Sequence, residues 1–273
     1  MSVEYDISMR VTFEKLGLAL HDIPEWFCCG ASSAHMTDAS LSDALAAKNL
    51  ALASHIADQI VVPCAACFHR LGTTNYKLKD DEEFCATINE QIKGQYQGNA
   101  QVIHPLQVIA EKFDKDQLSE MLIKPLSGLK VASYYGCLLL RPAEIAIDDQ
   151  ENPTIMDDLV SSLGGEPIDW GFKVECCGGG MTLAHKETVI GLGQRIIEDA
   201  QLNNADCIMV ACPMCHANLD IYQEQMKLNN STPILYFTEL LGLAIGIEDK
   251  NMAIDRHIIS ATDLLKKRGL IDG

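Results

Sequence analysis

Residues 136–215 contain three cysteine motifs, Gly136-Cys137, Cys176-Cys177-Gly178-Gly179-Gly180 and Cys212-Pro213-Met214-Cys215. An earlier part of the chain repeats two of these motifs, as Cys28-Cys29-Gly30 and Cys64-Ala65-Ala66-Cys67. The step from the second cysteine of the pair to the first cysteine of the C-x-x-C motif is 35 positions in both copies, Cys29 to Cys64 and Cys177 to Cys212. The equal spacing indicates a duplicated metal-binding unit.

The duplication predicts two tandem domains, residues 1–126 with an incomplete motif and residues 127–273 with the complete five-cysteine motif. The polar segment 113–128 is interpreted as the connection between them. When the two cysteine pairs are aligned, the counterpart of Cys137 falls upstream of Met1. We therefore expect the first domain to lack its opening strand and its first cysteine. Three explanations stay open: a start that omits a strand, a degenerate site that holds a cubane cluster or zinc, or an empty site.

Short apolar segments alternate with stretches of helical periodicity, which predicts an α/β fold with mainly parallel sheets. A charged stretch over residues 77–90 is expected to be less ordered, with a further helix before Gly94 left open. Sites in such sheets gather beyond the carboxyl ends of the strands, where Cys64, Cys137 and Cys212 are expected. The strands are predicted near residues 60–62, 102–104, 129–135, 167–170, 208–210 and 234–236, and the helices near 9–20, 42–60, 65–79, 155–163 and 188–203.

The net charge of −17 argues against nucleic-acid binding, because lysine and arginine would have to supply the affinity for phosphates. No stretch approaches the roughly 20 apolar residues that cross a bilayer, so we expect a cytoplasmic protein without a membrane span. Nine of the eleven cysteines lie in the motifs, and in a reducing compartment they are metal ligands or redox centres rather than disulfides. The other two, Cys85 and Cys207, are interpreted as structural.

Thiolates are soft ligands that favour iron-sulfur clusters, zinc or copper(I). A tetrahedral zinc or a cubane cluster needs four of them, whereas the second copy offers five. Adjacent cysteines suit a larger, irregular cluster in which one thiolate bridges two metals. Gly178 and Gly179 remove side-chain bulk beside the pair, so that backbone N–H groups can approach the cluster. A C-x-x-C motif at the start of a helix also favours thiolates through the helix N-terminus.

The order of a lone cysteine, Cys-Cys-Gly and C-x-x-C resembles the family of the heterodisulfide reductase B subunit and its relatives. The resemblance covers nearly the whole chain and is strongest after Leu129. Further phrases carry it: Tyr135-Gly136-Cys137 with Arg141-Pro142, Glu151-Asn152-Pro153-Thr154, Val210-Ala211-Cys212-Pro213-Met214-Cys215 and Leu240-Leu241-Gly242-Leu243-Ala244.

This resemblance implies noncubane [4Fe-4S] clusters, each held by five cysteines, that split the disulfide between coenzyme M and coenzyme B into two thiols. The implied partners are the ferredoxin-like [4Fe-4S] C subunit and the flavin-containing A subunit of such a complex, and the substrate is a small thiol/disulfide couple or a sulfur carrier. The implied second site consists of Cys137, Cys176, Cys177, Cys212 and Cys215, which hold the catalytic cluster. The implied first site retains Cys28, Cys29, Cys64 and Cys67, for a second [4Fe-4S] cluster or zinc, or it is empty.

Two alternatives to disulfide chemistry stay open. One is an electron-relay protein, similar to the cysteine-rich subunits of lactate, glycolate or succinate oxidoreductases or of a bacterial sulfur-oxidising complex. The other is a zinc-based thiol sensor or scaffold. His185 and His216 lie beside ligand loops and are candidate proton donors, although a loop histidine bonded to backbone is the commoner role.

Overall fold

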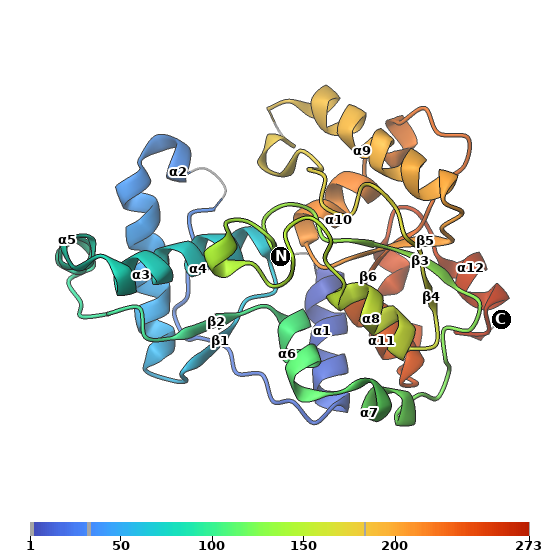
Figure 1. Ribbon diagram of the computed structural model, residues 1–273, viewed down its shortest axis with the longest axis horizontal. Helices are drawn as coiled ribbons and strands as arrows, with labels where there is room; N and C mark the ends of the chain where they lie inside the picture. Colours follow the sequence, from blue (N-terminus) through green and yellow to red (C-terminus); the bar gives the residue numbers. More distant parts are fainter. Residues whose placement is uncertain (1–2, 32–33, 183, 273) are drawn as a thin grey trace. The chain divides into compact units, whose positions relative to one another are not determined.

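The computed structural model describes residues 3–31, 34–182 and 184–272, which form two compact units (Figure 1). The first unit comprises Met1–Leu20, Ile109–Cys137 and Glu151–Gly273, and the second comprises His21–Val108 and Leu138–Gln150. Neither unit is one continuous stretch of chain, and residues 126 and 127, where the duplication predicts a domain boundary, both lie inside the first unit. The predicted boundary between residues 126 and 127 therefore stays a prediction about the duplicated sequence.

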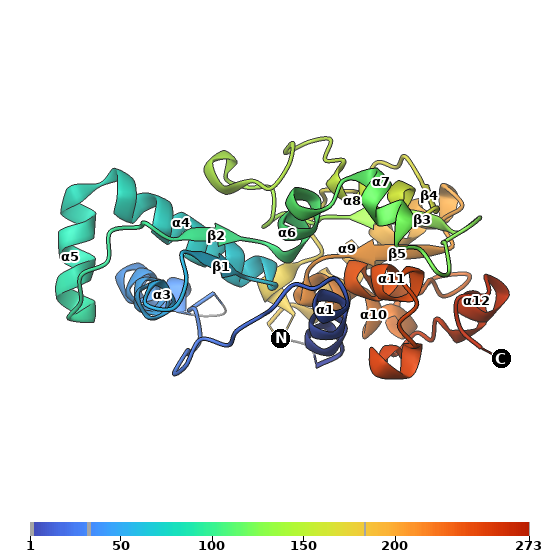
Figure 2. The same ribbon diagram turned by 90° about the horizontal axis from the view of Figure 1, so that it is seen from below.

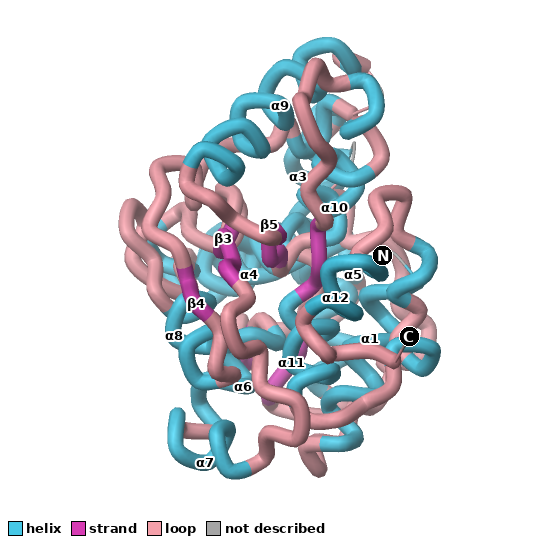
Figure 3. The backbone as a smooth tube through the Cα atoms, turned by 90° about the vertical axis from the view of Figure 1, so that its right-hand side faces the viewer, coloured by secondary structure: helices cyan, strands magenta, loops and turns pink. Residues whose placement is uncertain are grey.

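The first unit is built on a four-stranded parallel sheet in the order β4-β3-β5-β6, drawn in magenta in Figure 3. Its strands are β3 (Lys130–Tyr134), β4 (Glu166–Pro167), β5 (Cys207–Val210) and β6 (Ile234–Tyr236). Every residue of β5 is buried, as expected for a central strand between helices. The fold class and the parallel pairing predicted for this region are confirmed.

Helices of the first unit pack against this sheet. Helix α8 (Ile155–Ser162) packs against β3 and β4, and α10 (Pro213–Asp220) packs against β5 and β6. Leu163 is the C-cap residue of α8, and the next residue, Gly164, has a left-handed φ of +79° that ends the helix. The remaining helices of this unit are α1 (Val3–Lys15), α7 (Lys115–Glu120), α9 (Lys186–Leu202), α11 (Phe237–Ala244), α12 (Thr262–Lys267) and the 3₁₀ turns Gly179–Met181, Gln223–Gln225, Asp249–Asn251 and Ile254–Arg256.

Helix α1 lies beside α11 (Figure 2), although the sequence assigns residues 1–20 to the first domain. All eight residues of α11 are buried, so its polar groups need partners. Thr238 finds them on α1: its hydroxyl lies 2.8 Å from Ser8 Oγ, and its carbonyl accepts a hydrogen bond from Thr12 Oγ1 at 3.1 Å. These polar contacts fix the register of the two helices.

The second unit contains a two-stranded parallel sheet, β1 (Gln59–Val61) with β2 (Gln101–Ile103). Among its described residues no further strand extends this sheet, in agreement with the expected lack of an opening strand. Helix α3 (Ala39–Ser54) packs against α4 (Ala65–Asp80) and α5 (Glu82–Ile92). The unit also contains α2 (Ala34–Thr37) and the 3₁₀ turn Ala143–Ile145, and α6 (Pro105–Lys112) follows β2.

The prediction of a less ordered stretch over residues 77–90 is wrong. Helix α4 continues to Asp80, and α5 follows at once. Asp81 caps α5 by accepting a hydrogen bond from the N–H of Phe84 at 2.9 Å, and Glu82 and Glu83 lie in the positively polarised first turn. The high charge of this stretch therefore comes from helix capping and an exposed helix face.

No helix among the described residues is both long and apolar enough to span a membrane.

Candidate metal site

The five motif cysteines of the first unit come from three segments that converge at the carboxyl end of its sheet. Cys137 follows β3, and Cys212 follows β5 and is the N-cap residue of α10. Gly136 has a φ of +66°, and a Cβ atom on it would lie 3.1 Å from the Cys215 sulfur. A side chain at this position would enter the space between the thiols, so the glycine permits their close approach.

The thiols of the first unit lie in contacting pairs. Cys137 Sγ is 4.0 Å from Cys176 Sγ, and Cys177 Sγ is 3.6 Å from Cys215 Sγ. The thiol of Cys137 lowers the pKa of Cys176 to about 6, and the thiol of Cys215 lowers the pKa of Cys177 to about 7. The donors Cys137 and Cys215 have raised pKa values because each holds its proton for a thiolate neighbour. Thiolates are therefore available here near neutral pH.

Burial divides these five cysteines. Cys177, Cys212 and Cys215 are buried, whereas Cys137 is half-buried and Cys176 is exposed. A group bound by all five would be enclosed on one side and open to solvent at the Cys137–Cys176 side.

The Cys176–Cys177 loop is held by residues that the sequence analysis did not single out. The Tyr134 hydroxyl donates a hydrogen bond to the Glu175 carbonyl at 2.6 Å, which ties β3 to the cysteine pair. The Asn218 amide, on α10, donates to the Cys177 carbonyl at 3.2 Å and contacts the Cys177 sulfur at 3.5 Å. The position of Asn218, one helical turn after Cys215, is the sequence signal that could have found it.

Lys173 joins the Cys137 segment to the Cys176 segment. Its carbonyl accepts hydrogen bonds from the N–H groups of Tyr135 at 2.9 Å and Gly136 at 3.2 Å. Its ammonium group forms a 2.6 Å ion pair with Asp157 on α8, and both side chains are largely buried. The ion pair attaches Lys173 to α8, and the Lys173 carbonyl holds the Cys137 segment beside the Cys176 segment.

The four motif cysteines of the second unit follow the same plan. Cys64 follows β1 as the N-cap residue of α4, and Cys67 lies in the first turn of that helix. Cys29 Sγ and Cys67 Sγ are 2.8 Å apart. The Cys67 thiol lowers the pKa of Cys29 to about 7 and that of Cys64 to about 6, while Cys28 is exposed.

The two thiol sites thus share an electrostatic arrangement. In each, the last cysteine of the C-x-x-C motif lies beside two other motif sulfurs, and their contact raises its pKa. Among the described residues, no group of three or more His, Cys, Asp or Glu side chains is arranged to hold a metal ion. The ligand sets therefore stay predictions, supported by the convergence of the thiols.

Cys85 and Cys207 lie apart from these sets. Cys207 is fully buried in β5, and burial raises its pKa to about 12. Cys85 Sγ lies 3.4 Å from the Tyr96 carbonyl and accepts from Asn89 at 3.3 Å. These surroundings agree with the structural role expected for both.

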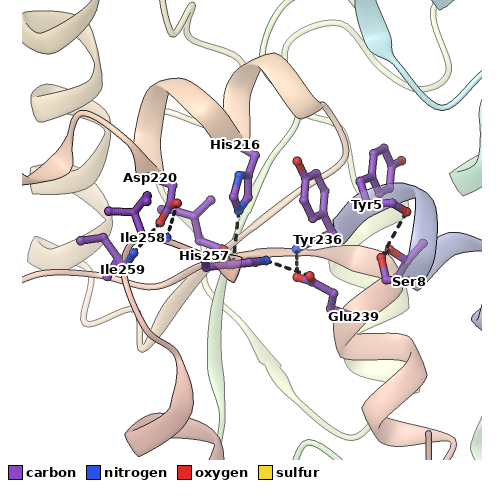
Figure 4. Close-up of polar contacts among 11 residues, drawn as sticks. Tyr5, Ser8, His216, Asp220, Tyr236, Glu239, His257, Ile258 and Ile259 are labelled. Atoms are coloured by element: carbon purple, nitrogen blue, oxygen red, sulfur yellow. Dashed lines mark hydrogen bonds and ion pairs between the residues drawn. The ribbon is translucent and has the colours of Figure 1, made fainter. Parts of the chain in front are cut away.

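The two histidines considered as candidate proton donors have different environments. His185 is the exposed N-cap residue of α9. His216 is buried on α10, stacked on Tyr236 with ring centroids 4.5 Å apart, and its Nε2 lies 3.3 Å from His257 Nδ1 (Figure 4). Burial, with the charge of His257, lowers the pKa of His216 to about 3. His216 is therefore a neutral imidazole near pH 7, without the acidic second proton of an imidazolium.

The His257 side chain continues this buried polar network. Its Nδ1 contacts the Ile234 carbonyl at 2.8 Å. Its Nε2 contacts Glu239 Oε1 at 2.8 Å (Figure 4). Burial alone would lower the pKa of His257, but Glu239 outweighs it and the pKa is raised. The pKa of Glu239 is also raised, because its carboxyl group is fully buried. We interpret the pair as sharing one strongly held proton.

Together these observations define a class, a duplicated cysteine-rich α/β protein whose thiols gather at the carboxyl ends of parallel strands. The CCG family, described as a cysteine-rich domain, matches residues 3–72 and 131–220. The chain therefore belongs to the CCG cysteine-rich domain family, as the resemblance in its sequence predicted.

Proteins similar to this chain are components of oxidoreductases. The 8-methylmenaquinol:fumarate reductase membrane anchor subunit of Wolinella succinogenes is 33% identical over 96% of this chain and 94% of its own length. The B subunit of the ferredoxin/F420H2-dependent CoB-CoM heterodisulfide reductase of Methanosarcina acetivorans is 30% identical over 94% of this chain and 89% of its own length.

A structural relative shows the fold alone. The crystal structure of a hypothetical protein from Helicobacter pylori superposes with a TM-score of 0.74 at 13% identity and covers 94% of this chain. The present chain spans 49% of that protein.

Proposed function

We propose that this chain is an iron-sulfur component of an oxidoreductase complex and works on a thiol/disulfide couple, as the B subunit of heterodisulfide reductase does. The observation that carries the proposal is the convergence of five thiols from three segments at one end of the sheet. Cys137, Cys176, Cys177, Cys212 and Cys215 would hold a noncubane [4Fe-4S] cluster, which supplies single electrons when bound.

The residues present fit such a group chemically. Cys176 and Cys177 have lowered pKa values, and metal binding requires thiolates. The Gly178 N–H lies 3.4 Å from Cys176 Sγ, and the Asn218 amide lies beside Cys177 Sγ. Donors of this kind stabilise negative charge on cluster sulfurs. Gly136 keeps the space between the thiols clear of a side chain.

The burial pattern supports access by a small substrate from one side. Cys176 is exposed and Cys137 half-buried, whereas the other three cysteines are closed off by the protein. Reduction of a disulfide to two thiols consumes two electrons and two protons. Because His216 is buried and its Nε2 faces His257, we assign the protons to solvent at the open side rather than to His216.

The second unit would hold a further [4Fe-4S] cluster, zinc or no metal at Cys28, Cys29, Cys64 and Cys67. Its described residues contain four motif cysteines, one fewer than the first unit. Chemistry that needs two equal five-cysteine clusters is therefore less well supported than chemistry at one cluster. The electron-donating partners would be a ferredoxin-like [4Fe-4S] protein and a flavin-containing protein of the same complex.

A second candidate function is electron relay without disulfide chemistry. It is favoured by the similarity to the fumarate reductase membrane anchor, which is at least as strong as the similarity to the heterodisulfide reductase B subunit. In this role the cluster of the first unit would pass electrons to a partner that carries out the reaction.

Anaerobic reconstitution followed by iron and sulfide analysis and paramagnetic resonance tests the proposal. The wild type should contain iron and show a cluster spectrum, and Cys177→Ala should lose the spectrum of the first unit. Cys207→Ala is the matched control, since it removes a buried thiol of the same unit outside the motifs. Equal iron content in wild type and Cys177→Ala would contradict the ligand assignment.

Addition of a thiol to the oxidised protein separates the two candidate functions. A thiol that alters the cluster spectrum supports disulfide chemistry, whereas an unchanged spectrum supports relay. Zinc in both units without iron would exclude both.

A further inference from the structure

We propose that Asn218, oriented by Thr182, is a positioning residue that sets the reduction potential of the metal group through the Cys177 sulfur. This inference rests on the proposed iron-sulfur site. It concerns residues of this chain that lie outside the cysteine motifs.

The geometry begins with the Asn218 amide. Asn218 is fully buried on α10, and its Nδ2 lies 3.2 Å from the Cys177 carbonyl and 3.5 Å from the Cys177 sulfur. A carbonyl oxygen can only accept, so the amide nitrogen and not its oxygen must face Cys177. One N–H then serves the carbonyl, and the second is available to the sulfur.

Thr182 fixes the other end of this amide. Its Oγ1 lies 2.8 Å from Asn218 Oδ1 and 2.8 Å from the Gly179 carbonyl. The hydroxyl has one proton: when it donates to Oδ1 it holds the amide with its nitrogen toward Cys177, and the Gly179 carbonyl competes for the same proton. Thr182 therefore ties the glycine segment after Cys177 to the same asparagine that contacts Cys177.

An N–H directed at a thiolate stabilises its negative charge, and this effect is larger in a buried site than in water. The Asn218 amide is such a donor, and its nitrogen lies 3.5 Å from the buried Cys177 sulfur. In a metal group, added electron density spreads onto the ligand sulfurs, so the same N–H favours the reduced state. Its loss should make the potential more negative.

The second unit offers an internal comparison. Arg70 follows Cys67 by three positions, as Asn218 follows Cys215, and Ala34 follows Cys29 by five, as Thr182 follows Cys177. Arg70 forms an ion pair with Asp43 at 3.6 Å, and alanine has no hydroxyl to orient a partner. The asparagine–threonine arrangement is thus found at the five-cysteine site and has no equivalent at these positions of the four-cysteine site.

Asn218→Leu removes the donor at similar side-chain volume, and Thr182→Val removes only the orienting hydroxyl. Asn203→Leu is the control, because Asn203 caps the far end of the 17-residue helix α9, about 25 Å along that helix from the cysteine loop. The readout is the midpoint potential of the cluster signal in an anaerobic redox titration of the full chain after reconstitution.

We expect a more negative potential in Asn218→Leu, a smaller shift in the same direction in Thr182→Val, and no shift in Asn203→Leu. If Asn218→Leu takes up no iron, the Thr182→Val potential decides. Unchanged potentials with wild-type iron content would overturn the inference and leave the proposed function intact. A wild-type protein without iron would instead overturn the proposed function.

Discussion

Gly178, directly after the Cys176–Cys177 pair, should tolerate no side chain. Its φ is +87°, and a Cβ atom built on it would lie 2.9 Å from Val189 Cγ2 and 3.3 Å from Val189 Cα. Val189 is fully buried on α9 and has little room to move. The left-handed backbone costs an alanine about 1–2 kcal/mol, and overpacking costs about 1–3 kcal/mol.

These costs are partly offset in Gly178→Ala, because alanine lowers the entropy of the unfolded chain by up to about 1 kcal/mol. The net loss of unfolding free energy is then about 1–4 kcal/mol, which corresponds to about 2–16 °C in Tm for a unit of this size. Gly180→Ala is the matched control, since apart from Gly180 and its two chain neighbours no heavy atom of the described residues lies within 4 Å of its Cβ position. Its effect should stay within about 0.5 kcal/mol.

The assay must report the first unit alone. The chain has two tryptophans, of which Trp170 is buried in the first unit and donates a hydrogen bond to the Ser133 carbonyl at 3.1 Å. Trp26 belongs to the second unit and is 67% exposed, so Trp26→Phe makes a neutral background. Thermal unfolding followed by Trp170 fluorescence then compares the two glycine variants. Equal Tm values for Gly178→Ala and Gly180→Ala would refute the packing argument.

Two further predictions concern buried charges of the first unit. Lys173→Met should lower the unfolding free energy by about 3–5 kcal/mol, because it leaves the buried carboxylate of Asp157 unpaired; Lys115→Met, which breaks an exposed ion pair, should cost at most about 1 kcal/mol in the same urea titration. The pKa of His257 is raised, so the folded pair with Glu239 keeps a proton that the unfolded chain releases above about pH 6.5. The stabilisation that this proton gives the folded protein is full below that pH and is lost as the pH rises through the raised pKa. The decline in unfolding free energy amounts to at most about 1.4 kcal/mol per pH unit, and Glu239→Gln should flatten it. Urea unfolding at several pH values from 6 to 9 measures the decline, and the same dependence on pH in the variant would contradict the shared proton.

The sequence predicted the parts of the site that depend on local pattern. Cys64 and Cys212 are followed by helices because each ends a β-branched strand and begins a C-x-x-C turn. Gly164 ends a helix because it reaches the left-handed region without strain. These signals lie within a few residues of the feature they predict, so periodicity and spacing suffice.

Contacts between distant segments could not be predicted in this way. The pairing of Ser8 with Thr238 joins helices that are 230 positions apart, and nothing in the pattern of α1 specifies α11 as its neighbour. Tyr134 resembles an ordinary strand residue until its hydroxyl is seen to hold the Glu175 carbonyl. The helix over Glu82–Ile92, which the sequence leaves open, is hard to predict for a different reason: its capping charges resemble those of a solvated, less ordered stretch.

The two thiol sites share their backbone arrangement and differ in the side chains around it. The backbone arrangement of strand, C-x-x-C and helix N-terminus is the same in both units. The order of histidine and aromatic residue is reversed between the units. Phe68 packs edge-on against His104 in the second unit, whereas His216 stacks on Tyr236 in the first unit.

Both ring pairs occupy equivalent places, because Phe68 and His216 each follow the last cysteine of the motif. The polar surroundings differ more, since Arg70 brings a full positive charge where Asn218 brings a neutral amide. A full charge acts over a longer range than a single N–H dipole and also draws in a counter-ion, here Asp43. The two sites therefore share a scaffold for thiolates and differ in the polar groups beside it, so we expect equal groups bound to them to differ in reduction potential.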